Sequence, residues 1–293
     1  MAGAAARESG DTIGPMRSSE VARAANRARF ARLVARPEPE IDLVLGALCI
    51  AADGRPQLEF EPTVTAVDAM AERVRIRLDR GDGPEVGVAR LHGVLYHEQR
   101  LRGPRTTEYD DVRNSQIDQV IERRIGLPIA LAVIELEVAW RIGIRLQGIG
   151  LPGHFILRTP TGTLIDPADS GRSLTPDDCQ ALLRQSLGDR LLFHPGMLRP
   201  AGRREILARM LRNLRGVYLT QRDWPAGLGI VELLAVVEPT EPDHGRDRAL
   251  LLGRMGRFTD SIAGLSHYLE ERPDASDADD VRQVMGIFRG RRN

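Results

Sequence analysis

Apolar residues in the first eighty positions recur mostly at helical spacing. Residues 18–36 carry an apolar stripe of this kind and open on serines that can cap a helix, while Pro37 and Pro39 end it. Two further helices are predicted over residues 41–52 and 62–80, and in the second of these the apolar side chains follow the i, i+3, i+4 rule. Residues 18–80 are therefore predicted to form a group of helices.

The next segment contains the longest helix of the middle region. Asn114 is predicted to cap a short helix that stops at Gly126. Pro128 then fits the first turn of a helix over residues 128–142, since a proline there loses no intrahelical hydrogen bond, and Gly143 ends it.

Short strand patterns follow this helix. Residues 144–150, 153–158 and 164–166 are apolar runs separated by turn residues, and Thr175-Pro-Asp-Asp178 resembles a capping box that starts another helix. Helices come first and strands afterwards, so we predict an α+β fold with a small antiparallel sheet.

The end of the chain shows only helical signals and a 34-residue repeat. Thirty-four residues with a small residue, an aromatic and a closing proline is the tetratricopeptide pattern. A further amphipathic helix around residues 281–288 would cap the array, and two repeats need support from the middle region because about three are required to bury a core. The matching pairs are Tyr218 and Leu252, Trp224 and Phe258, Gly227 and Ser261, Leu228 and Ile262, Leu234 and Tyr268, and Pro239 and Pro273.

The stretch GHFILRTPTGTLIDP, residues 153–167, predicts a β-hairpin. With a loop over residues 159–161, His154 lies opposite Asp166; with a loop over 160–162 and Gly162 left-handed, the register moves by two and the pair is diagonal. Side chains alternate with period two, so both registers keep His154 and Asp166 on one face and within hydrogen-bond reach.

This pair has two interpretations. A carboxylate that orients an imidazole is half of a catalytic triad. A His–Asp bridge between two strands is also an ordinary way to satisfy a half-buried histidine. The residues alone leave both open.

Composition narrows the classes of partner. The 41 basic residues balance the 41 acidic ones, which gives no overall field to attract nucleic acid or an anionic membrane. The longest uncharged apolar run, residues 43–52, is too short to span a bilayer. Cys49 and Cys179 form no CxxC pair, which argues against a zinc ribbon or a disulfide framework. We expect a cytoplasmic protein.

The central motifs resemble the transglutaminase-like superfamily, which has a papain-like architecture. They are GLPIALAVIELEVAWRIGI, GIGLPGHFILR and LIDP. More closely, the chain resembles the SirB-type bacterial proteins, a transglutaminase-like domain followed by tetratricopeptide-like helices. The resemblance implies that His154 and Asp166 occupy the positions of the superfamily's catalytic histidine and aspartate.

The resemblance does not supply a nucleophile. The superfamily's cysteine stands at the N-terminus of the helix, and that position is taken here by Pro128, as in the SirB-type proteins themselves. Ala130 stands where relatives often carry a serine or threonine. Cys179 lies early in its own helix but near the apolar face, and Cys49 lies in an apolar run, so both are expected to be core residues.

Other chemistry has weaker support. His154, Asp166, Asp169, Glu135 and Glu137 are the donors available to a metal, but no HExxH, HxH or CxxC motif accompanies them, so we expect neither a metal nor a cofactor. A basic segment is usually a solvated helix face, although it can dock an acidic partner. This one comprises Arg199, Arg203, Arg204, Arg209, Arg212 and Arg215.

Two hypotheses follow. The first is a transglutaminase-like protein without its nucleophile that binds a protein or peptide through the repeat region. The alternative is an atypical hydrolase or acyl-transfer enzyme in which His154, oriented by Asp166, acts as a general base for water. The expected organisation is a disordered segment over residues 1–17, a transglutaminase-like domain over 18–198, and tetratricopeptide-like repeats with a capping helix over 199–293.

Overall fold

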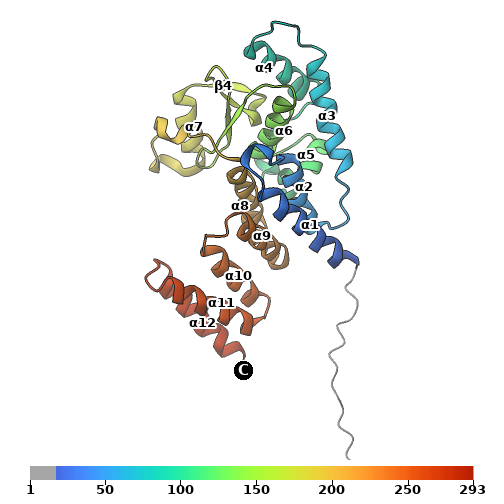
Figure 1. Cartoon of the computed structure of the whole chain (residues 1–293). Coiled ribbons are helices and arrows are strands. Elements are labelled where there is room, and N and C mark those ends of the chain that lie inside the picture. Colours follow the sequence, from blue (N-terminus) through green and yellow to red (C-terminus); the bar gives the residue numbers. More distant parts are fainter. Residues whose placement is uncertain (1–17, 293) are drawn as a thin grey trace, which may run out of the picture.

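A computed structural model describes residues 18–292, so the disorder predicted for residues 1–17 lies outside the described residues. A helical and sheet-bearing part forms one end, and a rod of helices leads from it to the C-terminus (Figure 1). The predicted α+β class, with a small antiparallel sheet and an all-helical tail, is confirmed.

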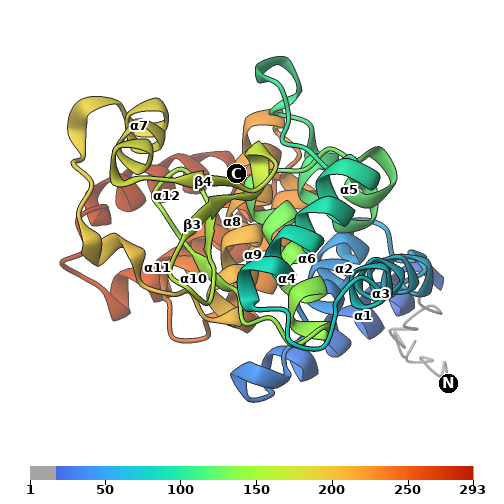
Figure 2. The same ribbon diagram turned by 90° about the horizontal axis from the view of Figure 1, so that it is seen from above.

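Helix α6 (Pro128–Arg141) is the centre of the first part. Every residue from Pro128 to Ala139 is buried. Seen from above, α6 lies between the N-terminal helices and the sheet (Figure 2). The surrounding helices are α1 (Ser18–Val34), α2 (Leu43–Gly54), α3 (Glu61–Arg75), α4 (Pro84–His92), which a π-helical turn (Gly93–Glu98) continues, and α5 (Ile117–Arg123).

The sheet is an antiparallel meander. Its strands are β1 (Gln147–Ile149), β2 (Ile156–Arg158), β3 (Leu164–Asp166) and β4 (Arg172–Leu174), in that spatial order. Leu157 and Ile165 face the main core with α6, whereas Ile156 and Leu164 face a second cluster under α7 (Pro176–Leu187). Both faces are therefore covered.

The hairpin between β2 and β3 adopts the second of the two predicted registers. Arg158 pairs with Leu164, the loop is residues 160–162, and Gly162 has a φ of +95°. That left-handed conformation costs a glycine nothing, which explains why this register forms.

The tail consists of helical pairs with the predicted period. Trp224 and Phe258, 34 positions apart, each begin the second helix of a pair, and the turns before them contain Arg222 and Gly256, both with positive φ. The helices are α8 (Arg203–Gln221), α9 (Trp224–Val237), α10 (Asp243–Arg254), α11 (Phe258–Glu271) and α12 (Ala278–Arg292). As expected, α8 and α9 lean on the middle region, where they pack against α2.

Two local predictions were wrong, and one strand was not predicted. Asn114 does not cap α5; it lies in a 3₁₀ turn, where its buried amide donates to the carbonyl of Glu108. Gly126 does not end that helix, because Arg124 already takes the left-handed conformation. Strand β4 was missed, since only three residues of weak pattern form it.

Short 3₁₀ helices connect the main elements. They are Glu38–Glu40, Thr106–Glu108, Val112–Ser115, Pro167–Asp169, Gly188–Arg190 and Pro195–Leu198. Between residues 18 and 292, no helix is long and apolar enough to cross a bilayer.

Two glycines of α10 provide a test of the packing in the tail. A Cβ on Gly253 would lie 2.2 Å from the buried ring of Phe288, whereas one on Gly245 would meet nothing within 4 Å. We expect Gly253→Ala to lower the free energy of unfolding by about 1–3 kcal/mol through overpacking. Gly245→Ala, the control, should raise it by up to about 1 kcal/mol. Urea titration measures both, and equal effects would contradict the close contact between α10 and α12.

Candidate functional site

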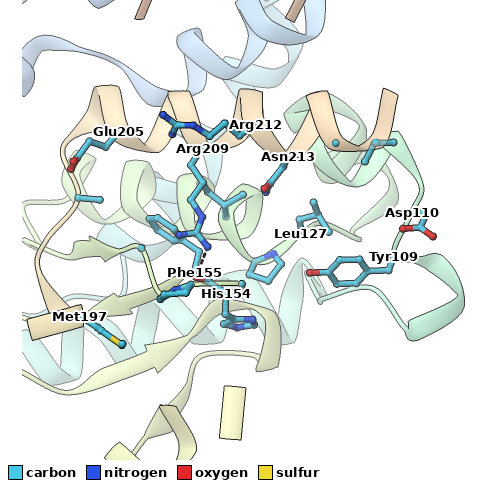
Figure 3. A pocket seen from close by; sticks show the side chains of 18 of the residues that line it. Tyr109, Asp110, Leu127, His154, Phe155, Met197, Glu205, Arg209, Arg212 and Asn213 are labelled. Atoms are coloured by element: carbon cyan, nitrogen blue, oxygen red, sulfur yellow. Dashed lines mark hydrogen bonds between the residues drawn. The ribbon is translucent and has the colours of Figure 1, made fainter. Parts of the chain in front are cut away.

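A cavity of about 920 Å³ lies between the loop that carries His154 and helix α8 (Figure 3). It is lined by two parts of the chain that are distant in sequence. The first part supplies Tyr109, Asp110, Leu127, Pro128, Ile129, Gly150, Pro152, Gly153, His154 and Phe155, and the second supplies Gly196, Met197, Arg199, Ala201, Glu205, Arg209, Arg212, Asn213, Gly216, Val217, Thr220, Gln221 and Glu238.

His154 and Asp166 form the hydrogen bond that the hairpin predicts. Nε2 of His154 lies 3.0 Å from each carboxylate oxygen of Asp166. The Asp166 side chain is only 4% exposed, and it also accepts from the backbone N–H of Ala168 at 2.9 Å. The aspartate is thereby fixed from two sides and holds the imidazole ring in one orientation.

The second ring nitrogen of His154 has no partner among the described residues. Because a carboxylate only accepts, Nε2 carries the proton, and a neutral ring then has a lone pair on Nδ1. Within residues 18–292, Nδ1 forms no hydrogen bond, and it is not among the fully buried atoms without a partner. His154 lines the cavity, so this nitrogen is accessible to a ligand or water.

Pro128 stands where the resemblance places a nucleophile. It is the first residue of α6 and lines the cavity together with Leu127 and Ile129. Its ring offers neither a nucleophilic atom nor an N–H, and the side chain of Leu127, the N-cap, provides no polar group. The wall at the start of α6 is therefore apolar.

The two cysteines lie elsewhere. Cys49 in α2 and Cys179 in α7 are 2% and 0% exposed, and neither is among the residues that line the cavity. Burial raises the pKa of Cys49 to about 11, although Arg29 partly opposes it. Burial raises the pKa of Cys179 as well, and the carboxylates of Asp178 and Asp166 add to that effect. The expectation that both are core residues is confirmed.

The basic segment is partly solvated, with the Arg199 and Arg212 side chains 70% and 44% exposed, but it is not the unpaired face that the sequence pattern indicates. Its arginines bind groups of the same chain: Arg199 pairs with Glu205, Arg203 stacks over Trp140, Arg204 pairs with Glu38, Arg212 with Glu238 and Arg215 with Asp247. These contacts fasten α8 to its surroundings.

Arg209 differs from the other arginines of the segment because it binds backbone carbonyls at the cavity and has no carboxylate partner among the described residues. From α8 it reaches the loop of His154, where Nη2 donates to the carbonyls of Leu151 at 2.6 Å and His154 at 2.7 Å (Figure 3). No carboxylate of the described chain lies within ion-pair distance of it. Burial lowers its pKa, and the neighbouring Arg212 adds to that effect. The sequence pattern alone did not single out this residue.

The residues considered as metal donors do not gather into one site in the described part of the chain. Glu135, fully buried, accepts from Tyr96 and lies 2.8 Å from His92 Nε2, and burial raises the pKa of Tyr96 well above its usual value. Glu137 accepts from the backbone N–H of Leu43. No group of three or more His, Cys, Asp or Glu side chains in the described part of the chain is placed to hold a metal ion.

Two family models and several known proteins match the chain. A model described as the transglutaminase-like superfamily matches residues 61–212, and one described as tetratricopeptide repeat matches residues 214–286. A protein named UPF0162 from Xylella fastidiosa is 35% identical over 250 residues, covering 83% of this chain and 88% of that protein.

More distant relatives share only part of the chain. A UPF0162 protein from Pseudomonas aeruginosa is 34% identical over 178 residues, 59% of this chain and 63% of that protein. F-box only protein 21 from mouse is 31% identical over 106 residues, which is 32% of this chain but 17% of that protein. No solved structure matches the chain significantly.

The buried thiols give a direct prediction. Because both are enclosed and their pKa values are raised, the thiolate fraction at pH 8 is small, and we expect neither Cys49 nor Cys179 to react with Ellman's reagent in the native protein. Both should react in denaturing urea. Rapid native labelling of Cys179 would show that this thiol is available for chemistry.

Proposed function

The chain belongs to the transglutaminase-like superfamily, and on that premise we propose that it binds a peptide segment of a partner protein in the cavity without forming a covalent bond to it. The proposal includes membership of the SirB-type proteins. It also includes a cytoplasmic location, with which the two unpaired thiols are consistent. We propose that the transglutaminase-like domain comprises residues 18–198 and that the repeats comprise residues 199–293.

One observation carries the proposal: the cavity is shared between the His154 loop and the first repeat helix. Repeat helices generally bind peptides on an extended face. Here α8 turns such a face toward the His154 loop, and the residues that line the cavity from it include Asn213, Thr220 and Gln221, whose polar groups suit peptide amides.

The side chains at the start of α6 support binding over catalysis. The start of α6 presents Pro128 to the cavity, and among the described residues that line it there is neither a cysteine nor a serine. His154 with its free Nδ1 then serves as a hydrogen-bond acceptor for a peptide N–H, held in orientation by Asp166.

A cavity-blocking variant tests this proposal. Gly216 lies on α8 at the cavity, and a Cβ there meets nothing within 4 Å. Gly216→Trp should therefore fold normally but obstruct binding. The protein is used to select peptides from a synthetic library of random N-acetylated decapeptides, and the affinity of the best peptide is measured by fluorescence anisotropy. We expect Gly216→Trp to weaken binding at least about tenfold, about 1.4 kcal/mol.

The matched control is Gly286→Trp on α12, where a Cβ also meets nothing within 4 Å and which lies outside the cavity. It should bind as the wild type does. The proposal is wrong if the wild type selects no peptide, or if the two variants lose affinity equally.

The free Nδ1 also favours a second candidate, a hydrolase that activates water. His154 acting as a general base contributes about 10²–10⁴-fold to a rate. If this is the function, a panel of activated esters and amides includes a substrate whose turnover disappears in His154→Ala and falls in Asp166→Asn. Turnover that survives in His154→Ala would rule out this role.

A further inference from the structure

Among the described residues that line the cavity, Arg209 is the one arginine without a neighbouring carboxylate. The cavity contains three arginines and three acidic residues along its described lining. Arg199 pairs with Glu205 at 2.6 Å, and Arg212 pairs with Glu238. Those two pairs leave Arg209 as the uncompensated cation and Asp110 as the uncompensated anion.

The guanidinium is held in a defined position. Its Nη2 donates to the two carbonyls of Leu151 and His154, and its Cζ lies 5.5 Å from the centroid of the Phe155 ring. A Cβ on Gly150 would lie 3.1 Å from Nη1, so a glycine at that position leaves room for the group. Nε and Nη1 donate to no residue between 18 and 292 and remain for a ligand.

A half-buried cation without a counter-charge is costly, and an anion that binds it recovers that cost. Two backbone carbonyls solvate part of the charge but do not neutralise it. The contacts with the His154 loop hold the Arg209 guanidinium in place at the cavity, as an anion site requires (Figure 3).

We propose that Arg209 binds a carboxylate group of the peptide that occupies this cavity. The inference rests on the proposed peptide-binding function and specifies the chemistry of the ligand. The two ion pairs are neutral, and Asp110 already gives the lining one unpaired negative charge. A carboxylate brings one further negative charge to Arg209, whereas a phosphate brings about two and is repelled more strongly by the acidic residues of the lining. The carboxylate belongs either to an Asp or Glu side chain or to the C-terminus of the peptide.

The test uses the best decapeptide selected from the random library, resynthesised in neutralised forms. One form has a C-terminal amide, and the others replace each Asp by Asn or each Glu by Gln. We expect one of these changes to weaken binding to the wild type at least about tenfold. The form that does so identifies the source of the carboxylate.

Variants of the protein assign the effect to Arg209. Arg209→Gln should bind the original peptide and its neutralised form with the same affinity, because the cation that paired with the carboxylate is gone. Arg209→Lys keeps the positive charge but lacks the planar guanidinium, so part of the affinity loss on neutralising the peptide should remain. This variant is informative even if Arg209→Gln loosens the His154 loop. Arg199→Gln is the control: that arginine lines the cavity but already has Glu205, so the sensitivity of the wild type should persist.

The outcomes separate the two proposals. If peptides bind but no neutralised form loses affinity for the wild type, the carboxylate inference is overturned and peptide binding stands. The same holds if the loss is as large in Arg209→Gln as in the wild type. If the library yields no binder at all, both proposals fail.

Discussion

The packing of α8 into the helical core is the constraint on which the rest of the arrangement depends. Leu207 of this helix fits against Gly46 of α2, where a Cβ would lie 2.7 Å from the leucine methyls. Burying one such side chain stabilises the fold by about 1.5–3 kcal/mol. The apolar face of α8 contributes six buried residues: Ile206, Leu207, Ala208, Met210, Leu211 and Leu214.

Polar contacts fix the same helix at its start. The carboxylate of Glu38 accepts from the backbone N–H of Arg203 at 2.5 Å, where unpaired N–H groups and the helix dipole favour an anion. Arg204 reaches back to Glu38 and to the carbonyl of Val34. With α8 held in this way, its opposite face is placed over the His154 loop, and the cavity between them has a fixed shape.

The sequence predicts much of this arrangement because several signals are local. Pro128 and Gly143 mark the two ends of α6, and the 34-residue spacing places the repeat helices. The sequence of the hairpin allows two registers, and both predict the His154–Asp166 contact. Helix ends and turns depend on the conformational preferences of a few neighbouring residues, so they can be predicted from the sequence alone.

What could not be predicted depends on partners far away in the chain. Six arginines spaced over residues 199–215 give no sign in the sequence of the carboxylates that pair with three of them, Glu38, Glu238 and Asp247. The position of Asn114 in the sequence is typical of a helix cap, but its side-chain amide donates to the carbonyl of Glu108 and accepts from Arg123 instead. Arg209 becomes distinctive only because the carbonyls it binds lie more than fifty residues before it.

The most direct test of the central claim, noncovalent peptide binding at the junction of the His154 loop and α8, is a crystal structure with a selected peptide. The account predicts the peptide between these two elements, with a carboxylate oxygen within hydrogen-bond distance of the Arg209 guanidinium and no bond to the protein. A peptide seated on α10–α12, or one joined covalently to a side chain, would contradict it.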